Sequence, residues 1–346
     1  MGGQFHIFIC HSALSLDGAV RICSEFDART LSRVRVLKFF PGTRGKIPVD
    51  IKIDEMFPCP DDYSEWSRPF HIATFFSAWL EKLELEGVGE LVVYIPHPFE
   101  LPGNYFAFSD SRVSALELLP DGLLNYVSRS LYPESLSRAV RLCTRIGLRL
   151  AASAIVGLPY RPFARGHLTQ FERKIYSSYW IENDEGYITR SGTRKNLPPC
   201  KVTLKSTRKA EPGRVLIIDQ EIGQLFDSEL ERGLRAELRA EIERLRPLKL
   251  FYKSHPRGRN RVVEFSAQAA EDISGPELAE RLIVELQIGT VLGFYSTPLL
   301  SENAGKGPQK IAILPNPNSP GIRQKRLLKE LRCVFEKSGV RLVAPR

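Results

Sequence analysis

A dense cluster of hydrogen-bond donors follows a predicted strand in the segment LKLFYKSHPRG, residues 248–258. Pro256 fixes the turn that follows His255. His255 could donate a hydrogen bond to a phosphate oxygen or protonate a leaving group. Lys253 and Arg257 raise the positive potential around it. A histidine that only hydrogen-bonds a turn is the structural alternative, and the neighbouring cations favour a phosphate site.

A second strand in the same half of the chain ends in hydroxyl groups. The apolar run 289–296 is predicted to end at Ser296 and Thr297, and Pro298 is well placed to open a helix. Hydroxyls and free backbone N–H groups at a helix start can hold an anion, although an ordinary helix N-cap has the same composition. Two such strand ends in one lobe predict two converging phosphate contacts.

Two further polar residues belong to this half. Glu277, at the start of a predicted helix over 275–286, could accept hydrogen bonds from ribose hydroxyls or only favour the helix dipole. Gln220 comes directly after the predicted strand 213–219. The predicted nucleotide- and donor-binding residues are therefore Lys253, Pro256, Arg257, Glu277, Ser296, Thr297 and Gln220.

Carboxylates in the first half are candidates for a general base. Asp121 and Gly122 come between a predicted strand and a predicted helix, where a carboxylate could face the ligand cleft. The alternative for Asp121 is a helix N-cap. A rival acidic sequence, Asp184-Glu185-Gly186, is typical of an exposed hairpin turn.

Polar residues after other first-half strands are candidates for acceptor binding. His97 and Asn104 belong to the segment YIPHPFELPGNYFAFS, and His11 and Ser12 follow the first predicted strand. From these we take Ser12, His97 and Asn104 as acceptor-binding residues, although polar loop residues are commonly just solvated.

Short apolar runs alternate with helical patterns, which favours an α/β fold. In the first half, strands are predicted over 5–10, 34–40, 90–95 and 113–119, and helices over 70–84, 122–131 and 134–146. In the second half, strands are predicted over 213–219, 248–253, 262–266, 289–296, 310–316 and 340–343, and helices over 227–246, 275–286 and 319–339. We place the domain boundary in the basic, proline-rich region before residue 211. Two Rossmann-like lobes, 1–210 and 211–346, favour a GT-B-like architecture with a ligand cleft between the lobes. In open parallel sheets, ligands bind at the carboxyl ends of the strands.

The composition limits the class of protein. The chain has 346 residues, a formal net charge of +9 and no apolar run long enough to cross a bilayer. We expect no signal peptide, because the N-terminus lacks a basic region and a small-residue cleavage site. The six cysteines form no CxxC pair, which is consistent with reduced thiols in a cytoplasmic protein. The positive charge favours an anionic partner, and no familiar nucleic-acid-binding pattern is present, so we expect no nucleic acid partner.

Three segments together resemble the motifs of bacterial sialyltransferases of the polysialyltransferase and lipooligosaccharide sialyltransferase groups. They are LPDG at 119–122, KSHPRG at 253–258 and YSTPL at 295–299. Their order and their positions after strands match that family, and the similarity in layout covers nearly the whole chain. Pro120 stands where the family usually has the first of two acids.

The resemblance implies a GT-B fold and an inverting transfer of sialic acid from CMP-sialic acid to a glycan or glycolipid acceptor, without a metal or cofactor. It implies that Asp121 is the general base, that His255 assists the departure of CMP, and that Ser296 and Thr297 hold the phosphate. The same nucleotide contacts would bind another CMP-activated acidic sugar, such as Kdo or a related nonulosonic acid. A transferase of such a sugar is therefore an alternative hypothesis. A non-catalytic, basic polyanion-binding protein is a further alternative. The basic helix near the C-terminus also suggests peripheral contact with an anionic inner membrane surface.

Overall fold

The computed structural model describes residues 4–39, 52–55, 66–122, 127, 136–170, 173, 175–181, 193–196, 210–220, 222–255, 270–275, 277–300 and 307–345. These residues form two compact units, one within 4–196 and one within 210–345. The predicted boundary at residue 211 stays a prediction, because 197–209 lie outside the described residues.

A parallel sheet of seven strands forms the centre of the first unit, in the order β3-β2-β1-β4-β5-β6-β7. Every adjacent pair of these strands runs parallel. The order runs outward from β1 in one direction and from β4 in the other, so the topology reverses between these two strands. The strands are β1 Phe5–Cys10, β2 Val34–Lys38, β3 Lys52–Glu55, β4 Leu91–Ile95, β5 Val113–Leu118, β6 Ser178–Ile181 and β7 Thr193–Asn196.

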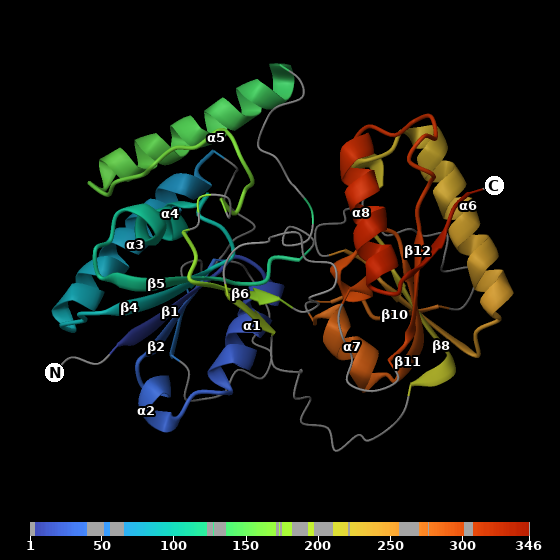
Figure 1. Ribbon diagram of the computed structural model, residues 1–346, viewed down its shortest axis with the longest axis horizontal. Coiled ribbons are helices and arrows are strands. Elements are labelled where there is room, and N and C mark those ends of the chain that lie inside the picture. The colour runs from blue at the N-terminus through green and yellow to red at the C-terminus, as the bar shows by residue number, and fades with distance from the viewer. Residues whose placement is uncertain are drawn as a thin grey trace. The chain divides into compact units, whose positions relative to one another are not determined.

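Helices cover both faces of this sheet, with α1 and α2 on one face and α3, α4 and α5 on the other (Figure 1). The strands are apolar on both sides, as a sheet covered on both faces requires; β4 is buried along its whole length. The helix α3 packs against both α4 and α5. The helices are α1 Ala13–Cys23, α2 Ala28–Leu31, α3 Arg68–Leu85, α4 Leu101–Phe108 and α5 Leu136–Ile155.

The second unit repeats this plan with a six-stranded parallel sheet in the order β10-β9-β8-β11-β12-β13. Its topology reverses between β8 and β11. The strands are β8 Glu211–Ile218, β9 Lys249–Lys253, β10 Glu271–Asp272, β11 Ile288–Gly293, β12 Gln309–Ile313 and β13 Arg341–Val343. Its helices are α6 Ser228–Leu245, α7 Ala279–Glu285 and α8 Lys325–Lys337, with short 3₁₀ turns η2 Ile222–Gln224 and η4 Thr297–Leu299.

The predicted α/β class with two Rossmann-like lobes is confirmed, because both sheets follow the strand order of that fold. Several boundaries are wrong. The helix predicted over 134–146 continues to Ile155, because an alanine-rich run extends it. The hairpin predicted around Glu185 lies outside the described residues, and the strands β6 and β7 on either side of that gap pair in parallel. The predicted strand 262–266 lies outside the described residues, as does nearly all of the predicted helix 122–131.

Two second-unit predictions also need correction. The helix predicted over 275–286 begins only at Ala279, so Glu277 precedes it rather than occupying its first turn. The strand predicted to reach Ser296 ends at Gly293, and Pro298 lies in a three-residue 3₁₀ turn instead of opening a longer helix.

Candidate active site

The topological reversal of the first sheet brings two histidines together. His11 follows β1 and His97 follows β4, and these strands are parallel neighbours at the point of reversal. The two ring centroids lie 4.9 Å apart, and the ring of Phe39 stacks on His11 at 5.1 Å. The Nε2 atom of His11 is buried and has no hydrogen-bond partner among the described residues. Burial, with His97 next in importance, lowers the pKa of His11 to about 3.

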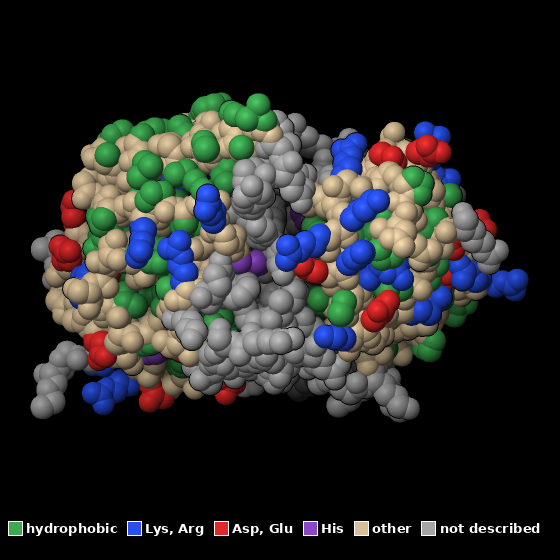
Figure 2. Space-filling view, turned by 45° about the horizontal axis from the view of Figure 1, so that its top comes forward, with side chains coloured by type: hydrophobic (Ala, Val, Ile, Leu, Met, Phe, Trp, Pro, Cys, Tyr) green, Lys and Arg blue, Asp and Glu red, His purple; other side chains and the backbone are tan. Residues whose placement is uncertain are grey.

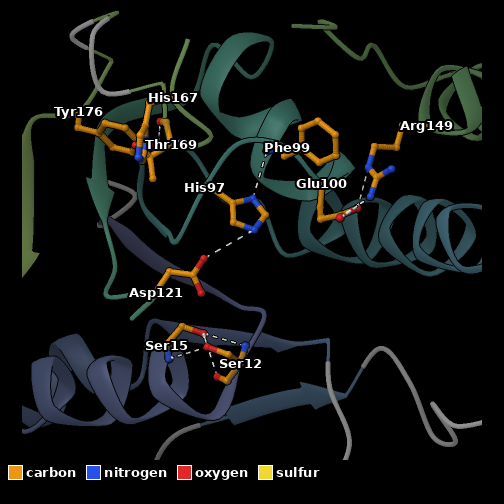
Figure 3. A network of polar contacts seen from close by, with 10 residues as sticks. All are labelled: Ser12, Ser15, His97, Phe99, Glu100, Asp121, Arg149, His167, Thr169 and Tyr176. Carbon is orange, nitrogen blue, oxygen red and sulfur yellow. Dashed lines mark hydrogen bonds and ion pairs between the residues drawn. The ribbon is translucent and has the colours of Figure 1, made fainter. Parts of the chain in front are cut away.

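His97 faces the predicted general base Asp121. The backbone N–H of Phe99 donates to His97 Nδ1 at 3.3 Å, so Nδ1 carries no proton and the neutral ring is protonated on Nε2. That Nε2 lies 4.0 Å from Asp121 Oδ2 (Figure 3). Burial lowers the pKa of His97, and the nearby carboxylates of Asp121 and Glu100 only partly oppose this. A neutral imidazole N–H therefore points at a carboxylate that is 15% exposed.

A buried ion pair stabilises the loop that carries His97. Arg149 of α5 donates through Nε and Nη2 to the two carboxylate oxygens of Glu100, at 2.9 and 2.5 Å (Figure 3). The guanidinium also lies 4.5 Å from the ring centroid of Phe99. Burial alone would raise the pKa of Glu100, but Arg149 outweighs it and lowers that pKa to about 2. The pair thus stays ionised and fixes the backbone on the C-terminal side of His97.

The turn that carries Asp121 packs closely on α1. A Cβ atom on Gly18 of α1 would lie 2.8 Å from Cγ of Pro120. Gly122, on the other side of Asp121, has a φ of 66°, in the left-handed region that favours glycine. The two glycines therefore fix the path of the chain around this carboxylate.

The remaining first-unit candidates hold backbone groups. Ser12 forms a capping box with Ser15 at the start of α1 (Figure 3). Asn104 is fully buried; its amide donates to the carbonyls of Pro98 and Arg161, and its Oδ1 accepts from the Arg161 backbone N–H. These bonds hold together the loops around His97. A part for Ser12 and Asn104 in acceptor binding stays a prediction.

In the second unit, the end of β9 places Lys253 and His255 at the carboxyl edge of the sheet. Lys253 Nζ donates to the Gly275 carbonyl at 3.0 Å, and burial lowers the pKa of this lysine. The Ser254 backbone N–H donates to Ser274 Oγ at 2.8 Å, so both residues before His255 are anchored. His255 is partly buried. The predicted donor-binding residues Pro256 and Arg257 lie outside the described residues.

The strand order of the second sheet reverses between β8, which precedes Gln220, and β11, which precedes Ser296. Gln220 Oε1 is buried without a hydrogen-bond partner among the described residues, which is unusual for a polar atom. Ser296 is 7% exposed, and its side chain makes no capping bond to η4. Thr297 is the first residue of η4 and is partly buried. Oε1 of Glu277 lies 3.7 Å from Nη1 of Arg281, so these two side chains form an ion pair.

Asp219 anchors the loop that carries Gln220. Its carboxylate accepts from the Tyr252 hydroxyl and the Gln220 backbone N–H, each at 2.8 Å, and pairs with Arg235 at 3.3 Å. The sequence gives one hint of this role, because Asp219 directly follows a fully apolar strand end.

The sequence analysis did not identify Glu100 and Arg149 as part of the site. Arg149 is buried in a helix that also carries the exposed Arg141 and Arg145, and only the packing of α5 distinguishes it from them. Among the described residues, no three His, Cys, Asp or Glu side chains converge as a metal site would require.

Comparison with solved structures finds proteins of the same fold. A sialyltransferase GT-B domain from Photobacterium damselae superposes with a TM-score of 0.55 at 13% identity, covering 99% of this chain and 100% of that one. An α/β-galactoside α-2,3-sialyltransferase from Photobacterium phosphoreum gives 0.59 at 12% identity, with 99% of each chain covered. A 2,6-sialyltransferase from a Vibrionaceae Photobacterium species, solved with CMP and lactose, gives 0.51 at 13% identity, with 98% and 78% covered. No family model and no curated protein matches the sequence. The predicted GT-B fold and its resemblance to bacterial sialyltransferase structures are thus confirmed at the level of the fold.

Proposed function

We propose that this protein is an inverting, metal-independent glycosyltransferase that moves sialic acid from CMP-sialic acid to a hydroxyl of a glycan. The observation that carries the proposal is the His97–Asp121 pair at the reversal point of the first sheet, in a chain whose fold matches bacterial sialyltransferases along its length. A solved relative in fold holds CMP and lactose, which supports this class of donor and acceptor.

Asp121 is the base in this mechanism. Its carboxylate takes the proton from the acceptor hydroxyl, whose oxygen attacks the anomeric carbon of the donor. The bond between that carbon and the CMP phosphate oxygen breaks, and its electron pair leaves with the phosphate. His97 presents its Nε2–H to Asp121, so the positive end of an N–H dipole faces a carboxylate that must be ionised to act.

The second unit supplies the nucleotide contacts. His255 protonates or stabilises the departing phosphate, and the hydroxyls of Ser296 and Thr297 donate to its oxygens. Gln220 Oε1 is a buried acceptor in need of a donor, which an amino or hydroxyl group of the nucleoside would supply. Lys253 and Ser254 hold the backbone before His255 through their bonds to Gly275 and Ser274.

The test combines nucleotide binding with turnover. We expect CMP to raise the melting temperature, while UDP and GDP do not; saturation at about 100 times the dissociation constant stabilises a protein by about 2.7 kcal/mol. We also expect CMP release from CMP-sialic acid to depend on added lactose. Gln220→Leu should weaken CMP binding about tenfold without loss of stability, because it removes a buried polar atom that has no partner. Stabilisation by UDP but not by CMP would refute the proposal.

A further inference from the structure

The connection that follows α5 bonds to two different loops of the first unit. Its residues 160–170 belong to no helix or strand, and we call this segment the strap. At its start, the Tyr160 hydroxyl donates to the Phe99 carbonyl at 2.9 Å, and the backbone of the next residue bonds to the Asn104 side chain. The strap is thereby attached to the loop that carries His97.

The far end of the strap bonds to the segment that follows the proposed base, Asp121. The Thr169 backbone N–H donates to Nδ1 of His167 at 3.1 Å, so this nitrogen carries no proton and the neutral ring is protonated on Nε2 (Figure 3). Nε2 lies 2.8 Å from the carbonyl oxygen of Val127, which can only accept, so the ring donates to it. Val127 is buried and closely follows Asp121 in the sequence.

The strap buries polar side chains, which is unusual for an irregular connection. Figure 2 shows hydrophobic side chains gathered over the upper part of the first unit in that view. The preceding helix α5, like the other helices among the described residues, is too short or too polar to span a bilayer. By contrast, His167, Thr169 and Gln170 are each at most 6% exposed. A buried polar side chain costs free energy unless it is hydrogen-bonded, so the bonds of these residues fix the strap in one position.

Gln170 holds the turn that presents His167 to the Val127 carbonyl. Its Nε2 donates to the His167 carbonyl at 2.6 Å and to the Arg165 carbonyl at 3.1 Å. Its φ of 54° lies in the left-handed region, which is unfavourable for a residue other than glycine. Its Oε1 is buried without a hydrogen-bond partner among the described residues. Strained groups of this kind persist where the surrounding structure over-determines them, and they cluster at functional sites.

The bond from His167 completes the support on both sides of Asp121. On the N-terminal side, the Leu119 backbone N–H donates to the Ile95 carbonyl at 2.8 Å. On the C-terminal side, the contact is the bond between His167 and Val127. A chain that is held before and after a carboxylate keeps that carboxylate in place. Position matters for transfer, because a displacement of about 1 Å can cost about 100-fold in rate.

We propose that His167 is a positioning residue for the base. Through its bond to Val127 it holds Asp121 at the correct distance from His97 and from the acceptor hydroxyl. This inference rests on the proposed function, because it takes Asp121 as the base. One segment of the chain then sets the separation of the two facing side chains, whose Nε2 and Oδ2 atoms lie 4.0 Å apart.

A pair of substitutions separates the parts played by the two ring nitrogens of His167. Nε2 of glutamine is as many bonds from Cβ as Nε2 of histidine, so His167→Gln can still donate to the Val127 carbonyl. Asparagine matches only Nδ1, so His167→Asn keeps an acceptor for the Thr169 backbone N–H and loses the bond to Val127. We expect His167→Asn to lower kcat about 10- to 100-fold and to leave the KM for CMP-sialic acid unchanged. His167→Gln should keep most of the wild-type kcat.

Nuclear magnetic resonance of the histidine rings reports the position of Asp121 without turnover. In isotope-labelled protein, the Nε2 signal of His97 senses the carboxylate that faces it. We expect this signal to shift in His167→Asn and to stay in place in His167→Gln. If His167→Asn does not fold, Thr169→Val takes its place, since it removes the hydroxyl that lies 2.7 Å from Nδ1 of His167. It should change kcat and the His97 signal in the same direction, by less.

Trp79→Phe is the control for a general loss of stability. It removes a hydrogen bond of the same unit, from Nε1 of Trp79 to Oδ2 of Asp54 at 2.9 Å, and should leave kcat and the His97 signal as in the wild type. The proposal is overturned if His167→Asn, or Thr169→Val in its place, keeps the wild-type kcat and His97 signal. It is also overturned if His167→Gln loses as much activity as His167→Asn. A wild type that releases no CMP from CMP-sialic acid would refute the proposed function instead, and the His97 signal would still decide whether His167 positions Asp121.

Discussion

Replacing His11 by phenylalanine should remove much of the acid sensitivity of the first unit. His11 is stacked on Phe39 and lies beside the tilted ring of His97, and burial holds it neutral with a pKa of about 3. In the unfolded chain a histidine titrates near 6.5. Between these two values the unfolded chain binds a proton that the folded chain does not. The free energy of unfolding therefore falls as the pH falls below about 6.5.

The size of this effect follows from the two pKa values. Linkage gives a loss of about 2 kcal/mol from His11 alone between about pH 7.5 and about pH 5. For a unit of this size, that loss lowers the melting temperature by roughly 4–8 °C. Phenylalanine keeps the stacking and removes the titrating group together with the unpartnered Nε2 atom. The variant should be at least as stable as the wild type at neutral pH and lose that part of the pH dependence.

Scanning calorimetry at the two pH values measures the difference. The unfolding transition of the first unit is followed for wild type, His11→Phe and His71→Gln. His71, on α3, is a histidine of the same unit outside the cluster and serves as the control. We expect the control to keep the wild-type difference between the two pH values. Equal pH dependence in His11→Phe and wild type would show that the burial of His11 does not hold it neutral.

Substitutions at Arg149 and Gly18, each with a companion variant, test the framework around Asp121. Arg149→Leu leaves the Glu100 carboxylate, which is only 17% exposed, without its partner. We therefore expect the free energy of unfolding in urea to fall by about 3 kcal/mol, and by less when Glu100→Gln is added. Gly18→Ala puts a Cβ atom 2.8 Å from Cγ of Pro120, so we expect the turn to shift and transfer to slow severalfold. Gly147→Ala is the comparison in α5, where a Cβ atom would have no other atom within 4 Å. This variant should raise the free energy of unfolding by about 0.5–1 kcal/mol.

The buried strands on either side of the reversal of the first sheet were the part of the fold that the sequence predicted well. Apolar runs such as 5–10 and 91–95 are typical of buried parallel strands, and polar residues that follow them must lie at one edge of the sheet. This reasoning places His97 and Asp121 in one site. It could not show which ring nitrogen of His97 faces the carboxylate, because that depends on the Phe99 backbone N–H.

The errors have physical causes of the same kind. The apolar run that reaches Ser296 predicted a strand up to that residue, but the strand ends at Gly293 and Ser296 precedes a short 3₁₀ turn. The periodicity of α5 predicted a helix, but periodicity is the same for a face that packs and a face that is exposed. Only the structure shows that Val140 and Ile155 point away from the core.

Initial transfer rates of Asp121→Asn, beside Glu185→Gln and wild type, test the central claim most directly. Asparagine caps a helix about as well as aspartate does, so a structural role predicts near-normal activity. Loss of a general base instead predicts a rate lower by about 100- to 10,000-fold with CMP affinity unchanged, since the nucleotide contacts that we propose belong to the second unit. Glu185→Gln should transfer at the wild-type rate. An active Asp121→Asn enzyme, or one that has lost CMP binding together with turnover, would contradict the account.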